Sequence, residues 1–195
     1  MPELSPEAEG KWKQLCRLLI SYNDFKHASS VAHFYLNGDF DVDREEWDGG
    51  DYYERRVTGE AMNSAMIVSY ARPFSGNDKA VKEKIPDLPG RYLRLLDENE
   101  LRVHKNILSS RNKRVAHSDS EAWEMMPYQL EMAEGRKRVV PVCNDTLRPL
   151  PKEDIRTLVS ICGTFMNAIV DERKELETQL DVYFPEMLVA ESENG

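Results

Sequence analysis

The sequence has few cysteines and no long uncharged run. Its three cysteines, Cys16, Cys143 and Cys162, are odd in number, scattered and never in a C-x-x-C pair, which argues against a disulfide framework or a zinc knuckle. The longest stretch without a charged residue, Thr157 to Val170, has 14 residues, fewer than the roughly 20 that span a bilayer. The first residues lack the basic and apolar regions of a signal peptide. We therefore expect a cytoplasmic protein that does not enter membranes.

Common nucleotide-binding and hydrolase motifs are missing as well. The chain contains no G-x-G-x-x-G, no P-loop, no G-x-S-x-G and no H-E-x-x-H, so the corresponding classes of enzyme have no support. His27 and His33 are six residues apart, and a metal-binding pair on one helix face needs a spacing of three or four. We predict neither a metal site nor a cofactor from these residues.

One acidic segment resembles the start of a calcium-binding loop. Asp39, Asp41 and Asp43 alternate as the first ligands of such a loop do. In the same register, the sixth and twelfth positions fall on Arg44 and Gly50, where the loop needs a glycine and a bidentate glutamate. The segment is therefore better interpreted as a solvated loop.

The overall composition is that of a folded protein with an acidic surface. The chain has 195 residues, of which 41% are hydrophobic and 31% charged, and its formal net charge is −9. This length suits one domain, which we place over residues 1–195, with a frayed tail at about 188–195. The acidic balance argues against indiscriminate binding to nucleic acid or membranes, but it leaves room for a local basic site.

Hydrophobic spacing predicts mostly helices. The expected helical regions are residues 5–37, either as two helices or as one kinked helix, then 52–72, then 91–117 with a break near 97–99, and finally 152–183. Between the last two, residues 118–150 lose the helical period. Two short segments around Glu134-Gly135 there predict a β-hairpin, at 128–132 and 137–143. We expect an all-α helical bundle with a small β-hairpin insertion, at about 120–150, before the final long helix.

The same spacing predicts which residues face the core. In the second region these are Val57, Ala61, Ala65 and Val68. In the third, Leu101, Leu108 and Val115 recur every seven residues. The final helix has the longest apolar face: Ile155, Leu158, Val159, Cys162, Phe165, Met166, Ile169, Leu176 and Leu180.

One segment has the opposite charge to the rest of the chain. Residues 101–117 contain five Lys or Arg, two of the four histidines and no Asp or Glu. The remainder has 21 basic and 35 acidic residues, a net charge of −14. An anion-binding surface is therefore plausible here, with phosphate as a natural ligand of the guanidinium groups.

A structural interpretation of the same segment stays open. Basic residues near a helix C-terminus favour the helix dipole, and His117 would cap the last carbonyl groups. Arg111 fits this interpretation less well, because it lies on the predicted stripe of Leu108 and Val115, where a charge has to be paired or functional. Composition and spacing alone leave both interpretations open.

The string Ser110-Arg111-Asn112-Lys113-Arg114-Val115-Ala116-His117-Ser118-Asp119 resembles a known signature. It is similar to the motif of the HEPN superfamily, which is an arginine, a polar residue, several variable residues and a histidine. The fuller string resembles that of a HEPN group associated with abortive phage infection. The resemblance covers the helical regions, about 5–117 and 152–183, and leaves out the hairpin and the acidic loop.

This resemblance implies a fold, an activity and partners. HEPN proteins are helical bundles that commonly form homodimers, and many are metal-independent endoribonucleases that act as toxins or antiphage effectors. By resemblance, His117 transfers a proton, Arg111 stabilises charge on the phosphate and Asn112 orients these groups. The other basic residues of the segment would bind the RNA, namely His104, Lys105, Lys113 and Arg114. A protein antitoxin is a further implied partner.

The alternative is a non-catalytic HEPN-like module that binds a nucleotide, RNA or a partner protein. Both kinds of protein occur in the superfamily. Some HEPN toxins also carry a tyrosine two residues after the histidine, which an antitoxin modifies. Here that position is Asp119, which argues against regulation of that kind.

Overall fold

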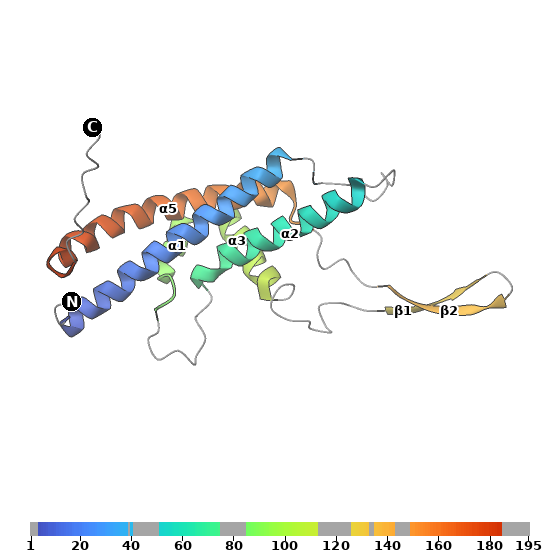
Figure 1. Cartoon of the computed structure of the whole chain (residues 1–195), viewed down its shortest axis with the longest axis horizontal. Coiled ribbons are helices and arrows are strands. Elements are labelled where there is room, and N and C mark those ends of the chain that lie inside the picture. Colours follow the sequence, from blue (N-terminus) through green and yellow to red (C-terminus); the bar gives the residue numbers. More distant parts are fainter. Residues whose placement is uncertain are drawn as a thin grey trace, which may run out of the picture.

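The computed structural model describes residues 4–38, 40, 51–74, 85–112, 126–132, 135–142 and 149–184. Within this described part, four α-helices form the body: α1 (Pro6–Asn37), α2 (Asp51–Ala71), α3 (Glu98–Ser110) and α5 (Lys152–Leu180). The long helices α1 and α5 lie antiparallel along each other, α2 packs on α1, and the shorter α3 packs on α2 and α5 (Figure 1). The predicted bundle is confirmed in this coarse form. No described helix combines the length and apolar character needed to cross a membrane.

The first helical region is one continuous helix. Ser5 caps it, because its Oγ accepts a hydrogen bond from the backbone N–H of Ala8 at 3.2 Å, and Pro6 suits the first turn. Asn23 and Asp24 do not interrupt the helix, which ends at Asn37. Of the two alternatives, two helices or one kinked helix, the division into two is excluded.

The remaining boundaries follow the sequence signals closely. α2 ends at Ala71 before a 3-10 turn, Arg72–Phe74. The predicted break near 97–99 is confirmed, because a 3-10 helix, Gly90–Leu95, precedes α3. A capping box then starts α3: the side chain of Asp97 accepts from the backbone of Glu100, and the side chain of Glu100 accepts from the backbone of Asp97. α5 continues into a last 3-10 turn, Asp181–Tyr183.

The buried faces of α2 and α3 differ from those predicted. On α2, Val57 and Ala61 are exposed, and Ala65 and Val68 are half-buried. The buried residues of α2 include Asn63, Met66, Ile67 and Tyr70. This face is the buried one because Met66, Ile67 and Tyr70 bury more apolar area than Ala61 and Ala65 would.

On α3, the predicted stripe lies at the edge of the buried face. Leu101 and Leu108 are half-buried, whereas Val103, His104, Ile107 and Ser110 are buried. Val115 lies outside the described residues. The predicted face of α5 is largely confirmed, although Val159 and Met166 are only half-buried.

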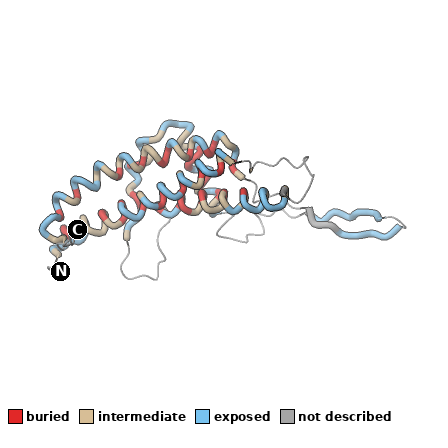
Figure 2. Tube along the Cα trace, turned by 45° about the horizontal axis from the view of Figure 1, so that its top comes forward, coloured by how far each residue is buried: buried red, intermediate tan, exposed pale blue. Residues whose placement is uncertain are grey.

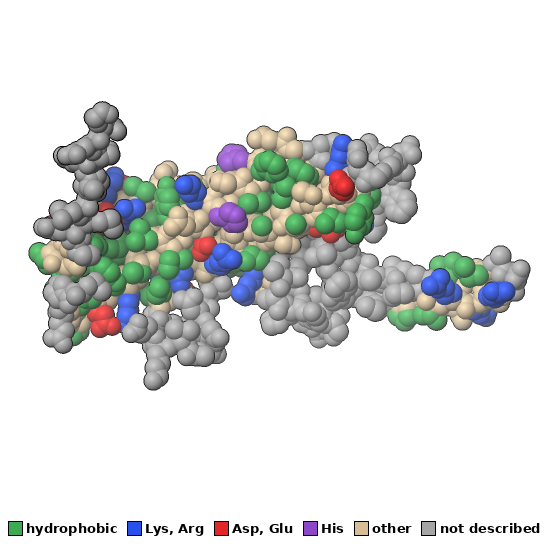
Figure 3. Space-filling view, in the orientation of Figure 1, with side chains coloured by type: hydrophobic (Ala, Val, Ile, Leu, Met, Phe, Trp, Pro, Cys, Tyr) green, Lys and Arg blue, Asp and Glu red, His purple; other side chains and the backbone are tan. Residues whose placement is uncertain are grey.

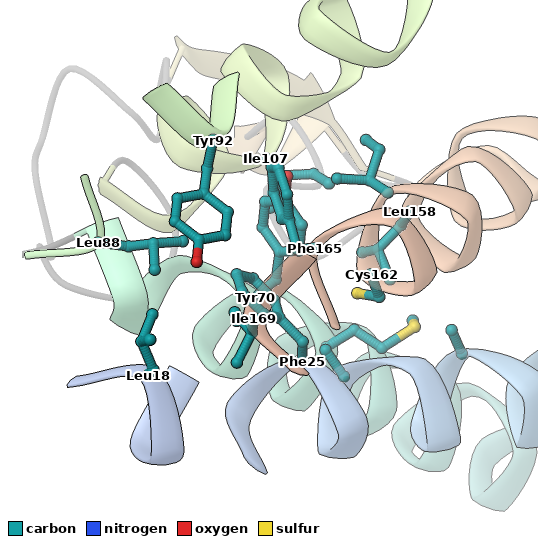
Figure 4. Packing of buried hydrophobic residues seen from close by; sticks show 14 of the residues in the cluster. Leu18, Phe25, Tyr70, Leu88, Tyr92, Ile107, Leu158, Cys162, Phe165 and Ile169 are labelled. Atoms are coloured by element: carbon teal, nitrogen blue, oxygen red, sulfur yellow. The ribbon is translucent and has the colours of Figure 1, made fainter. Parts of the chain in front are cut away.

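An aromatic cluster joins the helices at the centre of the core. Phe25 of α1 packs against Phe165 of α5, with the ring centroids 5.1 Å apart. Tyr70 of α2 lies 5.8 Å from Phe25, and Phe74 of the 3-10 turn lies 5.8 Å from Phe165. Figure 4 shows Phe25, Tyr70 and Phe165 with Ile107 of α3, all directed into one interior space. Burying these rings supplies much of the apolar area that holds the bundle together.

The predicted hairpin is confirmed. β1 (Met126–Glu131) pairs antiparallel with β2 (Lys137–Val142). Gly135 has φ +73°, a conformation that favours glycine in the turn. The hairpin extends away from the helices (Figure 1), and those of its residues whose burial is described are exposed (Figure 2). The ends of the predicted insertion, most of the acidic loop at 39–51 and the tail at 188–195 lie outside the described residues.

Truncating the central ring tests this core. Phe165→Ala is expected to lower the free energy of unfolding by about 3–5 kcal/mol, because it leaves a cavity among buried rings. The matched control is Phe34→Ala, whose side chain is 62% exposed, with an expected loss of at most about 1 kcal/mol. Equilibrium urea unfolding measures both. Equal losses in the two variants would contradict the core described here.

Candidate nucleic-acid interface

The described part of the predicted motif lies at the C-terminal end of α3. Arg111 follows the last residue of the helix, and its backbone N–H donates to the carbonyls of Ile107 and Leu108. Its side chain is half-buried, and Nη1 donates to Oδ1 of Asn112 at 3.1 Å. No carboxylate among the described residues pairs with Arg111. Its guanidinium therefore keeps donors for an anionic ligand.

Three predicted site residues cannot be placed beside Arg111. Lys113, Arg114 and His117 lie outside the described residues, so the structure provides no geometry for the pair of Arg111 and His117. Among the described site residues, the structure joins Arg111 and Asn112 by the hydrogen bond between their side chains.

The exposed face of α3 beyond its acidic first turn is basic and polar. Lys105, Asn106 and Ser109 are exposed and precede Asn112 on this side of the chain. Arg102 is exposed too, but its guanidinium bonds to Asn99 at 3.0 Å and to Asp154 of α5 at 2.9 Å. Lys105 is therefore the cation of α3 best placed to attract a phosphate together with Arg111. Since a helix C-terminus carries a partial negative charge, the attraction has to come from these side chains.

His104 is a core residue, which corrects the prediction that it binds substrate. It is 3% exposed, and its Nδ1 lies 2.9 Å from Oη of Tyr70. The ring also meets Phe74 edge-on, with centroids 4.7 Å apart. His104 and Lys105 are neighbours in sequence but lie on different faces of α3, one buried and one exposed, because successive helical residues are about 100° apart.

The surroundings of His104 keep its ring neutral. Burial, with a smaller contribution from the charge of Lys105, lowers the pKa of His104 to about 4. Burial also raises the pKa of Tyr70 well above its usual range, so its hydroxyl stays protonated. A neutral, buried imidazole cannot attract RNA. Its contribution is to hold α3 against α2.

A second polar cluster, unnoticed in the sequence, lies on the buried face of α1. The guanidinium of Arg17, which is 3% exposed, donates to the backbone carbonyls of Pro86 and Ile85. Asp24 accepts from Arg72 at 3.4 Å, and burial raises the pKa of its carboxyl. The sequence signal for this cluster is the spacing of seven residues between Arg17 and Asp24, which places both on one face of α1. The cluster ties residues 85–86 to α1, which indicates a structural role.

A shallow pocket of about 500 Å³ lies at the C-terminal end of α5. It is lined by Glu177, Thr178, Asp181 and Phe184 at the end of α5. Two carboxylates there disfavour a phosphate ligand. Among the described residues, no group of three or more His, Cys, Asp or Glu is placed to hold a metal ion.

Comparisons with known proteins add no relative to this picture: no family model matches the chain, and neither a curated protein nor a solved structure matches it.

The neutral state of His104 predicts a pH dependence of stability. Its pKa is about 4 when folded and about 6.5 when unfolded. Between these values the unfolded chain binds a proton that the folded chain does not, so acidification favours unfolding. From pH 6.5 to 4 this effect removes up to about 3 kcal/mol.

Urea unfolding of wild type and of His104→Gln across this pH range separates the contribution of His104 from that of the carboxyl groups. The variant is expected to be less stable at pH 7 and to lose less stability on acidification. An identical pH slope in the two proteins would show that His104 is not held neutral in the core.

Proposed function

We propose that the protein is a HEPN-type, metal-independent endoribonuclease that acts as a toxin or phage-defence effector. The observation that carries the proposal is the Arg111–His117 motif inside an acid-free segment, with Arg111 at the solvent-facing end of a bundle helix. The order of elements supports it, because one long helix, α5, follows the motif as the resemblance implies. The basic and polar outer face of α3 supports RNA as the ligand.

The proposed chemistry needs one proton-transfer group and one fixed cation. His117 removes the proton of a 2′-hydroxyl, or returns one to the departing 5′-oxygen, since imidazole titrates near neutrality. The 2′-oxygen attacks the adjacent phosphorus and the bond to the 5′-oxygen breaks. Arg111 stabilises the charge that develops on the phosphoryl oxygens. The products are a 2′,3′-cyclic phosphate and a 5′-hydroxyl.

The remaining residues bind and orient. Asn112, through its hydrogen bond to Arg111, restricts the directions in which the guanidinium points. Lys105, Lys113 and Arg114 attract the phosphates that flank the scissile one. In a homodimer, two motifs would share one cleft, as the resemblance implies, and an antitoxin that covers this cleft would inhibit the enzyme.

Cleavage of varied RNAs in EDTA tests the proposal. His117→Ala is expected to lower the rate about 10²–10⁴-fold through loss of proton transfer, and Arg111→Ala about 10²–10³-fold through loss of charge stabilisation. The matched controls are His33→Ala and Arg156→Ala, which remove an exposed histidine and an exposed arginine elsewhere in the bundle. Both controls should retain activity.

Two results would remove the enzyme proposal. One is equal cleavage by wild type and both motif variants, and the other is no cleavage by wild type of any RNA. If wild type binds RNA at the motif without cleaving it, the alternative function, a non-catalytic RNA-binding module, is supported instead.

A further inference from the structure

The β-hairpin exposes both basic and apolar side chains. Its two strands extend away from the bundle (Figure 1), and a two-stranded sheet alone is only marginally stable in water. Large apolar side chains are nevertheless exposed on it, with Tyr128 52%, Leu130 50% and Val139 63% exposed. Among the described elements, the hairpin comes next after α3 along the chain.

The strand register separates the hairpin side chains into two faces. Leu130 lies opposite Arg138, and Glu131 lies opposite Lys137. Since opposed residues share a face and successive residues alternate, Tyr128, Leu130 and Arg138 lie on one face. We call these three residues the Tyr128 face. The other face contains Gln129, Glu131, Lys137 and Val139.

The two faces differ in charge. On the other face, Lys137 is opposite Glu131 in the strand register, so this face carries one charge of each sign. On the Tyr128 face, Arg138 is opposite an apolar residue, and no described carboxylate forms an ion pair with it. In Figure 3 the coloured hairpin atoms in view are basic, hydrophobic or uncharged, without an acidic side chain. This uncompensated charge contrasts with the acidic total of the chain.

The spacing of Tyr128 and Arg138 suits a single-stranded RNA. The two residues are diagonal neighbours across the strands, a relation that places them about 7–8 Å apart and within reach of long side chains. An exposed tyrosine ring stacks on a nucleobase, and a nearby guanidinium binds the phosphate. Tyrosine and arginine are also enriched in protein interfaces, so the choice of RNA as the occupant rests on the proposed nuclease function.

We propose that the Tyr128 face binds a single-stranded segment of the RNA substrate, with a base stacked on Tyr128 and a phosphate on Arg138. The inference rests on the proposed function, because it adds a binding surface to the same nuclease. The hairpin then holds RNA at a distance from the motif, and it contributes to affinity and not to the chemical step.

Binding is measured in a His117→Ala background, which keeps the RNA intact. The probe is a fluorescein-labelled, unstructured single-stranded RNA of about 20 nucleotides, followed by anisotropy. Adding Tyr128→Leu, which keeps apolar area but removes the ring, is expected to weaken binding about 5- to 100-fold. Adding Tyr128→Phe, which keeps the ring, should leave the affinity within about twofold.

The charge is tested by a matched pair of neighbours. Arg138→Ala and Lys137→Ala each remove one positive charge from an exposed position of β2, but from opposite faces. Arg138→Ala is expected to weaken binding and to flatten the plot of log affinity against log salt by about 0.7. Lys137→Ala should leave that slope unchanged. Circular dichroism during thermal unfolding checks that the bundle is intact in every variant.

Equal effects of Arg138→Ala and Lys137→Ala, or full binding by Tyr128→Leu, would overturn the proposed face. Loss of self-association in Tyr128→Leu, with unchanged RNA affinity, would overturn it too and assign the face to a second copy of the chain. The outcomes separate from those of the nuclease test. If the Tyr128-face variants bind RNA more weakly but wild type does not cleave RNA, the RNA-binding face is retained and the nuclease is rejected. If wild type cleaves RNA but the hairpin variants bind it normally, the nuclease is retained and the RNA-binding face is rejected.

Discussion

The position of α3 depends on the insertion of His104 among aromatic side chains. Its imidazole is bonded to Tyr70 of α2 and meets the edge of Phe74, which follows α2. Val103 and Ile107, one residue before and three after it, are fully buried. This contact fixes the rotation of α3 about its axis. With that rotation set, Lys105 faces solvent and the chain leaves the helix at Arg111 with its guanidinium only half-buried.

The same contact separates a structural histidine from the basic surface. In sequence, His104 is one of a series of cationic or titratable residues between 102 and 117. In the structure, burial removes His104 from that series. The exposed residues of the described part of the segment are permanently charged or polar. A surface of this kind attracts phosphate over a wide pH range. The two carboxylates that line the pocket at the end of α5 lie in a different part of the bundle.

Helix positions could be predicted from the sequence because the caps are local. Ser5 and Asp97 bond to the backbone three residues further on, and such signals need no tertiary partner. The inward faces of α2 and α3 could not be predicted as well, because polar residues occupy them. Asn63 is buried since its Oδ1 accepts from the backbone N–H of Leu150, 87 residues away. No periodicity reveals a partner at that distance.

The candidate site was predictable only as a string of residues. Arg111 and Asn112 are predicted by residue type and order, and a hydrogen bond joins their side chains. The burial of His104 depends on Tyr70, 34 residues earlier in the chain, and it could not be deduced from the segment itself. The hairpin was predicted from its turn, but the unequal charge of its faces became evident only with the strand register.

The identity of the RNA ends after cleavage tests the central claim most directly, which is that the Arg111–His117 motif performs an acid–base transesterification. RNA incubated with the protein in EDTA is analysed by mass spectrometry for its terminal groups. We expect 2′,3′-cyclic phosphates on the upstream fragments and 5′-hydroxyls on the downstream ones. Fragments with 3′-hydroxyl and 5′-phosphate ends would contradict it, because a water molecule and not the 2′-oxygen would then have attacked the phosphorus.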